Sequence, residues 1–464
     1  MKRAGEAALR ASRSGYPDAN RWQVICGAGN NGGDGYVVAQ LAAMHGIVVS
    51  VVSLVDPESL NGDAAKAHSD FAAAGGVVVP WAGVLDPQAE LLVDAIMGSG
   101  LERNVDGTFA DAVAAINAHA ANVHAMDIAT GIHGDTGAVM GCAVVADLTT
   151  TFVGLKPGLF LGAGPNYCGK ITFADLEIDD AARSDIPAIY RRLHDRLLAN
   201  ALVPRPRGAH KGDFGHVLVV GGGPGMLGAA RLCAEAALRA GAGRVSVATH
   251  PDHATLITAT CPELMSHAIA PGNALKTGLI PLLQTADVVA FGPGLGRSDW
   301  AREIVEIVAE SDKPAVWDAD ALNGLADSPD RREYRVITPH PGEAARLLDS
   351  EAADIQSDRP AALAALVGKY GGTVVLKGAG TLISTESGIP FICSGGNPGM
   401  AAPGMGDVLT GIIAALIGQG LSVADAASVG VELHARAGDV AAKAGERGML
   451  ASDLLAALRP VANP

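Results

Sequence analysis

The chain has 464 residues, of which 49% are hydrophobic and only 4% aromatic, and its formal net charge is −15. This length is enough for two or three domains, each with a core of its own. The acidic balance, without any basic run, argues against a nucleic acid or an anionic membrane surface as a partner. No apolar stretch approaches the roughly 18 residues that a membrane span requires, so we expect no membrane association.

The succession of hydrophobic and glycine-rich segments predicts an α/β protein. Aliphatic runs such as 47–55 and 217–220 are typical of strands buried on both faces of a parallel sheet. Alanine-rich segments such as 228–243 are typical of helices packed closely on such a sheet. Residues 1–13 predict an amphipathic helix without the apolar core of a secretory signal.

The six cysteines are scattered along the chain and form no C-x-x-C pair. Such spacing favours isolated, mostly buried thiols over a disulfide or zinc framework. Reduced thiols are typical of the cytoplasm, and we therefore expect a cytoplasmic protein.

The first glycine-rich segment, 27–35, follows an apolar run and formally matches G-x-G-x-x-G. A lone match is weak, and a second one occurs at 223–228. Glycines let the backbone approach a ligand closely, and the free N–H groups at a helix start favour an anion. Asn30, Asn31 and Asp34 add side-chain oxygens to this segment. It therefore predicts a ligand site at a strand-to-helix turn.

Two later strands of the same half each end in an aspartate. Asp94 precedes a glycine-rich loop, and Asp127 precedes Thr130. Ligands of open α/β sheets bind at the carboxyl ends of strands, so these side chains and Asn31 should converge on one crevice. Oxygen ligands without Cys or His suit a hard cation. The alternative, that the aspartates only cap helices and form turns, stays open at this point.

These stretches, with the segment 153–159, resemble the NAD(P)H-hydrate epimerase domain over roughly residues 1 to 180. The resemblance implies a Rossmann-like parallel sheet and potassium ligands at Asn31, Asp94 and Thr130. Where the family usually has Pro-Ser after its Asp-Ile, this chain has Ala129 and Thr130. We expect Asp127 to be the catalytic residue. The substrate contacts that the resemblance implies are Asn30, Asn31, Gly32, Gly33, Asp34, Gly98, Ser99, Gly100, Leu101, Glu102, Arg103, Asn104 and Asp127.

Residues 181–207 are rich in charged and polar side chains and end with Pro204 and Pro206. Such a composition is typical of a connection between domains. We therefore place the boundary near residue 200, with domains at 1–190 and 200–464.

In the second half, Gly404-Met405-Gly406-Asp407 opens a long apolar helix. The N–H groups of a helix start can hold a phosphoryl oxygen as negative charge develops. An aspartate beside them can accept the proton of a substrate hydroxyl. For an isolated G-x-G-D, a glycine turn with a capping aspartate is the more frequent explanation.

Six segments in order, however, resemble the ADP-dependent NAD(P)H-hydrate dehydratase, a branch of the ribokinase-like superfamily. They are 207–249, 288–298, 315–325, 336–348, 373–384 and 396–420, within a resemblance that covers residues 200 to 464. The implied catalytic residue is Asp407, and the implied contacts to the hydrated nucleotide are Ala229, Gly294, His340 and Asp407. The implied adenine-nucleotide contacts are Lys377, Gly378, Ala379, Gly380, Thr381 and Gly406.

The combination predicts a two-domain enzyme that repairs hydrated NADH and NADPH. The first domain would interconvert the R and S epimers with K⁺, and the second would dehydrate the S form with ADP and Mg²⁺. The expected partners are these small molecules, and we expect a homo-oligomer. The alternative is a ribokinase-like kinase of a small hydroxymethyl compound, with the first domain as a non-catalytic scaffold.

Overall fold

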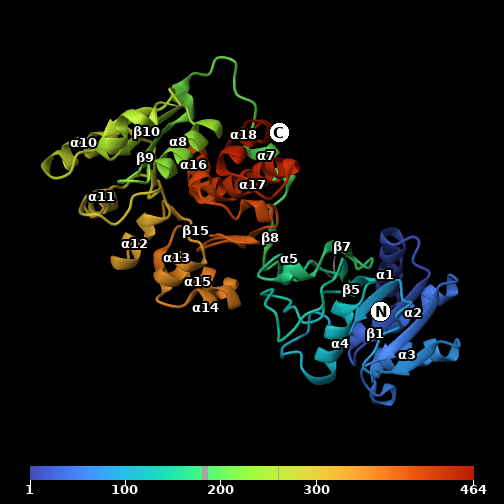
Figure 1. Cartoon of the computed structure of the whole chain (residues 1–464). Helices are drawn as coiled ribbons and strands as arrows, with labels where there is room; N and C mark the ends of the chain where they lie inside the picture. Colours follow the sequence, from blue (N-terminus) through green and yellow to red (C-terminus); the bar gives the residue numbers. More distant parts are fainter. Residues whose placement is uncertain (180–185, 260) are drawn as a thin grey trace. The chain divides into compact units, whose positions relative to one another are not determined.

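The computed structural model describes residues 1–179, 186–259 and 261–464. The chain divides into two compact units, Met1–Pro187 and Ala188–Pro464, and each has its own sheet and helices (Figure 1). Both units are α/β, as the sequence predicts.

The first unit is built on a seven-stranded parallel sheet of order β3-β2-β1-β4-β5-β6-β7. All residues of β4 and β6 are buried, which explains why their sequences show no polar alternation. The strands are β1 (Arg21–Cys26), β2 (Val48–Ser53), β3 (Val77–Pro80), β4 (Leu91–Ala95), β5 (Asn122–Met126), β6 (Leu148–Phe152) and β7 (Lys170–Ala174).

Helices of the first unit pack closely on this sheet. A Cβ atom at Gly35 of α2 would lie 2.6 Å from Ala95 Cβ of β4, so only glycine allows this approach. Strand order reverses between β1 and β4, where the connections leave in opposite directions and open a crevice at the carboxyl ends. The helices are α1 (Lys2–Gly15), α2 (Asn30–Met44), α3 (Gly62–Ala73), α4 (Gly107–Ala118) and α5 (Gly164–Tyr167), with 3-10 turns η1 (Pro57–Ser59) and η2 (Pro157–Leu159).

The second unit has a ten-stranded sheet of order β11-β10-β9-β12-β13-β14-β15-β16-β17-β8. Strands β9 to β15 in this sheet pair in parallel, whereas β16 pairs antiparallel with both neighbours. The strands are β8 (Arg191–Arg192), β9 (His216–Val220), β10 (Arg244–Thr249), β11 (Met265–Ala268), β12 (Val288–Phe291), β13 (Ala315–Trp317), β14 (Arg335–Ile337), β15 (Thr373–Leu376), β16 (Thr381–Thr385) and β17 (Phe391–Cys393).

At the centre of the second unit lies α16, whose residues are buried on nearly all sides. A Cβ at Gly411 would lie 2.0 Å from the Cys233 carbonyl oxygen, so α16 and α8 touch backbone to backbone. The α-helices are α7 (Asp195–Ala201), α8 (Leu227–Arg239), α9 (Ala254–Ile257), α10 (Asn273–Thr285), α11 (Asp299–Ala309), α12 (Asp320–Asp327), α13 (Pro341–Leu348), α14 (Ala352–Ser357), α15 (Arg359–Tyr370), α16 (Met405–Gly418), α17 (Val423–Ala441) and α18 (Ala451–Val461). The 3-10 turns are η3 (Lys211–Phe214), η4 (Pro251–His253), η5 (Pro398–Met400) and η6 (Ala442–Ala444).

Residues 191–199, which lie between the predicted domains 1–190 and 200–464, are part of the second unit, which begins at Ala188. The N–H of Arg191 donates to the Pro390 carbonyl at 2.8 Å, which adds β8 to the sheet edge beside β17. Leu193 and Leu198 are buried in the core of this unit. Two buried leucines and the pairing of β8 therefore attach this polar segment to the second unit.

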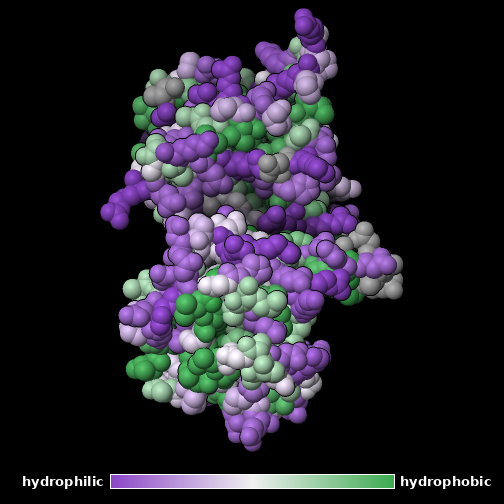
Figure 2. Space-filling view, turned by 90° about the vertical axis from the view of Figure 1, so that its right-hand side faces the viewer, coloured by the Kyte–Doolittle hydropathy of each residue, from purple (hydrophilic) through white to green (hydrophobic). Residues whose placement is uncertain are grey.

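The face of the molecule drawn in Figure 2 is mostly polar. Figure 2 shows hydrophilic side chains over most of the face in view, with hydrophobic ones gathered in separate groups. In the part of the chain that the structure describes, no helix has the length and apolar character needed to cross a bilayer.

Candidate active sites

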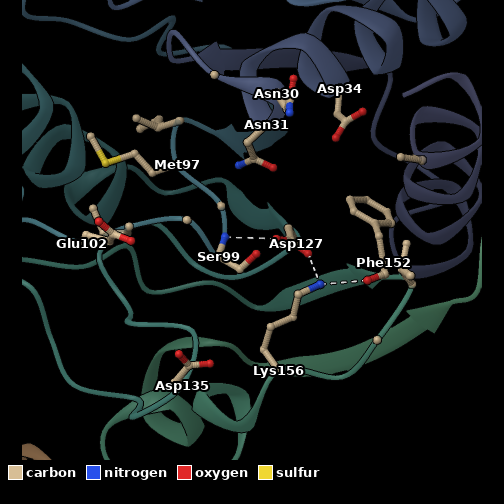
Figure 3. A pocket seen from close by; sticks show the side chains of 18 of the residues that line it. Asn30, Asn31, Asp34, Met97, Ser99, Glu102, Asp127, Asp135, Phe152 and Lys156 are labelled. Atoms are coloured by element: carbon tan, nitrogen blue, oxygen red, sulfur yellow. Dashed lines mark hydrogen bonds and ion pairs between the residues drawn. The ribbon is translucent and has the colours of Figure 1, made fainter. Parts of the chain in front are cut away.

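A cavity of about 1200 Å³ lies at the carboxyl ends of β1, β4, β5 and β6 in the first unit. Asn30, Asn31 and Asp34 from the start of α2 face Asp127 and Lys156 across it (Figure 3). Its wall also includes the loop that follows β4, from Ile96 to Arg103. The cavity therefore forms where the strand order reverses, at the edge where the sequence predicts a site.

Asp127 is the first residue after β5 and forms an ion pair with Lys156, which lies in the loop after β6. The Lys156 ammonium also donates to Thr151 Oγ1 at 3.1 Å and to the Phe152 carbonyl at 2.8 Å. The N–H of Ser99 donates to Asp127 Oδ2 at 3.1 Å. The loops after β4 and after β6 thus hold one carboxylate at the cavity wall.

The backbone at Asp127 has a φ of 67°, in the left-handed region that few residues other than glycine adopt. A Cβ at Gly98 would lie 3.1 Å from Asp127 Oδ2, so glycine lets the loop lie against the carboxylate. Such strain persists only where surrounding contacts enforce it, and it is frequent at functional sites.

The two carboxylates of this cavity have opposite pKa shifts. Burial alone would raise the pKa of Asp127, but the Lys156 ammonium and the Ser99 hydrogen bonds bring it below its ordinary value. Burial raises the pKa of Asp34 to about 7; the Met1 ammonium, 3.8 Å from Asp34 Oδ1, opposes this rise, and the Asp127 carboxylate adds to it. Asp127 is therefore the more acidic of the two carboxyl groups, and Asp34 keeps its proton to a higher pH. Such a pair can divide the roles of base and acid.

Asn31, Asp94 and Thr130 are brought together around the backbone from Ile96 to Gly98. Thr130 donates to Asp94 through its N–H at 2.8 Å and its hydroxyl at 2.7 Å, and its hydroxyl accepts from the Met97 N–H at 3.0 Å. Asn31 is buried against Gly98, and neither its Oδ1 nor its Nδ2 has a partner among the described residues. An unpaired buried amide is costly unless a ligand completes it.

Asp94 is fully buried beneath the cavity wall. Burial raises its pKa to about 6, and hydrogen bonds from Thr130 and the Ile96 N–H oppose the rise. The carboxylate can be ionised at neutral pH and is then a ready oxygen ligand.

The other expected contacts of this unit divide by position. Gly98, Ser99, Gly100, Leu101, Glu102 and Arg103 line the cavity. Gly32, Gly33 and Asn104 are not part of its wall. A Cβ at Gly32 would lie 2.1 Å from the Gly27 carbonyl oxygen, so Gly32 serves the tight turn before α2.

The second cluster of charged residues lies at the start of α16. Lys377, directly after β15, donates to Asp318 Oδ1 at 2.7 Å, and its ammonium is 3.6 Å from Glu343 Oε2. The Thr410 hydroxyl donates to Asp318 Oδ2 at 2.8 Å. A Cβ at Gly406 would lie 3.2 Å from Lys377 Nζ, so the backbone at the start of α16 lies directly on the ion pair.

Charge and burial set the ionisation of this cluster. Burial, together with the Asp318 carboxylate, raises the pKa of Asp407 to about 7, and Lys377 opposes this rise. Burial would also raise the pKa of Asp318, but Lys377 and the Thr410 hydroxyl hold it below its ordinary value. Asp318 is therefore a fixed anion, whereas Asp407 can exchange a proton near neutral pH.

His340 caps the N-terminus of α13. Its Nδ1 accepts from the N–H of Gly342 at 3.0 Å, and Glu343 Oε2 accepts from the His340 N–H at 2.7 Å. Its Nε2 lies 3.5 Å from Glu343 Oε1, and the side chain is 57% exposed, so the ring can also be reached by a ligand. The capping pair also directs Glu343 toward Lys377.

The loop Lys377–Thr381 is held from below by Arg359, which is 1% exposed. Its guanidinium donates to the carbonyls of Leu376 at 3.1 Å, Lys377 at 3.2 Å and Gly380 at 3.3 Å. A Cβ at Gly378 would lie 2.8 Å from Arg359 Nη1, so this glycine allows the loop to lie on the guanidinium. Arg359 thereby fixes the position of Lys377.

Ala229 and Gly294 are also neighbours. A Cβ at Gly294 would lie 3.0 Å from Ala229 Cβ, which brings the loop after β12 against the first turn of α8. Gly294 has a φ of 58° and its carbonyl accepts from the Gly223 N–H at 2.7 Å.

Comparison with known proteins decides the family. The model of the YjeF-related protein N-terminus matches residues 1–158, and the model of the NAD(P)H-hydrate dehydratase matches residues 217–460. The bifunctional NAD(P)H-hydrate repair enzyme of Coxiella burnetii is 46% identical over 100% of this chain and 94% of that protein. The chain belongs to the bifunctional NAD(P)H-hydrate repair enzyme family. The protein of this description from Escherichia coli is 44% identical over 100% of this chain and 89% of that protein.

Solved structures support the ribokinase-like fold of the second unit. A ribokinase-like superfamily protein of Enterococcus faecalis is 32% identical, with a TM-score of 0.54, over 59% of this chain and 97% of that chain. The ADP/ATP-dependent NAD(P)H-hydrate dehydratase of Bacillus subtilis, co-crystallised with ATP and Mg²⁺, is 26% identical with a TM-score of 0.52, over 59% of this chain and 98% of that chain. The family and fold that the sequence predicts are thereby confirmed.

Sequence reasoning missed several polar residues of this repair-enzyme chain. Asp318 ends an apolar strand as Asp94 and Asp127 do, so the same rule could have found it. Lys156 lies in a loop, and only the paired ends of β5 and β6 bring it to Asp127. Glu343, Thr410 and Arg359 lie within helices, where the sequence shows no signal of their role.

Proposed function

We propose that the first unit interconverts the R and S epimers of hydrated NADH and NADPH, and that the second unit dehydrates the S epimer at the expense of ADP. The observation that carries this proposal is that a relative named as a bifunctional NAD(P)H-hydrate repair enzyme aligns over the whole chain, while each unit has a charged cluster at its strand ends. The cytoplasm, with its nicotinamide nucleotides, is the location that this function implies, and a homo-oligomer remains our expectation.

The epimerisation site uses Asp127, Asp34 and Lys156. Hydration places a hydroxyl on the ring carbon beside the ring nitrogen. When that C–O bond breaks, the nitrogen lone pair forms a C=N bond and the hydroxyl leaves as water, with a proton from Asp34. Water then adds to the opposite face while Asp127 accepts its proton, and Lys156 keeps Asp127 ionised beforehand.

Potassium fits the residues that lie beside this site. Asn31 has a buried amide without a partner, and Asp94 and Thr130 supply further oxygens near the same backbone segment. Oxygen ligands of this kind suit a hard cation. A K⁺ held there would neutralise part of the negative charge at the cavity wall, and these three residues would hold it.

In the dehydration site, Asp407 accepts the proton of the hydrate's hydroxyl as that oxygen attacks the β-phosphorus of ADP. A new O–P bond forms, the bond to AMP breaks, and phosphate later leaves with loss of a ring proton to restore the double bond. The N–H groups at the start of α16 stabilise the transferred group, and Lys377 adds positive charge. We assign Ala229, Gly294 and His340 to the hydrate and the Lys377–Thr381 loop with Gly406 to the adenine nucleotide.

Magnesium would enter this site with the nucleotide phosphates. Within residues 1–179, 186–259 and 261–464, no cluster of three or more His, Cys, Asp or Glu side chains forms a ready metal cage. The carboxylates near Asp407 are nevertheless the oxygen ligands that Mg²⁺ prefers, and Mg²⁺ commonly binds through phosphates and a few carboxylates. It would screen the phosphate charge.

Two assays test the proposal. The purified protein is mixed with the S hydrate, ADP and Mg²⁺, and reduced-nicotinamide absorbance is followed, with ATP as the matched comparison. Separately, the R hydrate is mixed with protein and K⁺ without nucleotide, and the epimers are separated. We expect absorbance to return with ADP in preference to ATP, and the R and S forms to equilibrate. If hydroxymethyl pyrimidine is phosphorylated and the hydrate is untouched, the proposal is wrong.

A further inference from the structure

Two arginines of the second unit converge on one side-chain oxygen. Arg297, in the loop after β12, donates to Asn323 Oδ1 at 2.8 Å, and Arg346 of α13 donates to the same atom. Neither guanidinium has a carboxylate partner in the part of the chain that the structure describes. Two like charges held on a neutral acceptor repel each other, and an anion between them would remove that repulsion.

The arginines are tied to the proposed catalytic cluster through Asp320. Its Oδ2 accepts from the Gly296 N–H at 2.8 Å, directly before Arg297, and its Oδ1 accepts from Asn323 Nδ2 at 3.4 Å. Asp320 is also one of the charges that raise the pKa of Asp407. Asp320 therefore links the arginine pair to the charged cluster around Asp407.

The spacing of residues on α12 and α13 also places the arginine pair near the charged cluster. On α13, Arg346 follows Glu343 by three residues, and on α12, Asn323 follows Asp320 by three residues. Residues three apart share a helix face and are about one turn, roughly 5 Å, apart along the axis. Glu343 lies 3.6 Å from the Lys377 ammonium, and Asp320 and Glu343 both act on the charge of Asp407. One turn further on are Arg346 and Asn323, the acceptor for both guanidinium groups.

We propose that Arg297 and Arg346 bind a phosphate group of the dinucleotide hydrate, with Asn323 holding both guanidinium groups in place. This inference rests on the proposed function of the second unit and names a contact that fixes its substrate. In a nicotinamide dinucleotide, one ribose separates the reacting ring from the bridging diphosphate. A site about one helical turn past the residues beside Asp407 suits that diphosphate better than the 2′-phosphate at the far ribose.

The test uses steady-state kinetics of the full-length protein with S-NADHX and S-NADPHX. Arg297→Ala and Arg346→Ala should each raise KM for both hydrates about tenfold, and the double variant more, with KM for ADP unchanged. Arg331→Ala removes one positive charge elsewhere on the same unit, where Arg331 pairs with Glu386, and serves as the charge-matched control. It should leave both KM values unchanged.

The outcomes separate the possibilities. A KM increase confined to S-NADPHX would support phosphate binding but assign it to the 2′-phosphate. Unchanged KM values for both hydrates, or an increase confined to ADP, would overturn the proposal. If wild-type protein shows no dehydration with either hydrate, the proposed function fails rather than this inference. Binding of NADP⁺ and NAD⁺, followed by the shift in unfolding temperature, then still compares Arg297→Ala with wild type, and equal shifts would overturn it.

Discussion

Lys377 and Asp318 form an ion pair of 2.7 Å that joins the ends of β15 and β13 across the intervening strand β14. The pair lies directly beneath the backbone of Gly406, so it supports the start of α16. The Asp318 side chain is 2% exposed and the Lys377 side chain 18% exposed, so Lys377 is the more open member of the pair.

Asp318→Asn should therefore impair dehydration. The ammonium of Lys377 would lose its main partner, and Thr410 would lose its acceptor for a charge-assisted hydrogen bond. We expect kcat for dehydration to fall by about 10–100-fold, the loss typical of a disturbed electrostatic contact. Asp330→Asn, which breaks the pairs with Arg332 and Arg335 elsewhere in the same sheet, should destabilise the unit without this loss. Equal kcat losses in the two variants would contradict the assignment.

Asp407 should control the pH dependence of dehydration. Its pKa is raised to about 7, and it must be ionised to accept a proton, so activity should rise as pH increases through about 7. Asp407→Ala should lower kcat about 10²–10⁴-fold and remove this limb of the profile. Epimerisation by the same protein is the internal control. A profile without a step near pH 7 would argue against Asp407 as the base.

Asp407→Asn should stabilise the second unit at neutral and alkaline pH. Because the folded pKa exceeds the unfolded one, the carboxyl costs stability progressively as pH rises from about 4 to about 7. The amide avoids this cost. The unfolding temperature of the second unit, identified by its shift on ADP binding, should thus be higher in the variant than in wild type at pH 8. The difference between the two proteins should be smaller at pH 5. A difference in unfolding temperature that is larger at pH 5 than at pH 8 would contradict a raised pKa of Asp407.

Asp127→Asn keeps the size of the side chain but removes the base of the first unit. We expect folded protein with normal dehydration of the S hydrate and epimerisation lowered about 10²–10⁴-fold. The measurement is the rate at which the R hydrate is converted. Asp135→Asn is the control, because it changes another carboxylate of the cavity wall that forms no ion pair with Lys156. Normal epimerisation by Asp127→Asn would reject this residue, and indifference of wild type to K⁺ would reject the cation site alone.

Lys156→Met should shift the acid limb of the epimerisation profile to higher pH. The ammonium is one of the groups that lower the pKa of Asp127, so its removal lets burial raise that pKa. The ionised form of Asp127 would then be lost at a higher pH as the solution is acidified. Initial rates between pH 4 and 9 check this. A profile that keeps its acid limb would show that Lys156 does not tune Asp127.

The sheets and their ligand edges could be predicted from sequence because buried parallel strands leave continuous aliphatic runs. The 47–55 run and the 217–220 run carry this signal, and the glycine turns mark where each strand ends. The aspartates at strand ends could be located in the same way, since one topological rule brings strand ends together.

Contacts made across several elements could not be predicted. Lys156 reaches Asp127 only because β5 and β6 are neighbours, and Arg359 reaches the Lys377 loop only through the packing of α15 beneath β15 and β16. Leu193 and Leu198 show the converse, since two apolar side chains outweighed a polar local composition. Tertiary packing decides such positions, and no local pattern records it.

The most direct test of the account starts from the pure R hydrate of NADH, with ADP, Mg²⁺, K⁺ and the purified full-length protein. The S form is the expected substrate of the second unit, so reduced-nicotinamide absorbance returns only if both sites work in sequence. The account predicts rapid recovery with wild type. Asp127→Asn protein should recover at the rate of spontaneous epimerisation, and addition of Asp407→Ala protein should restore the fast rate. Full-rate recovery by Asp127→Asn alone, or no recovery by wild type, would contradict a chain with two complementary active sites.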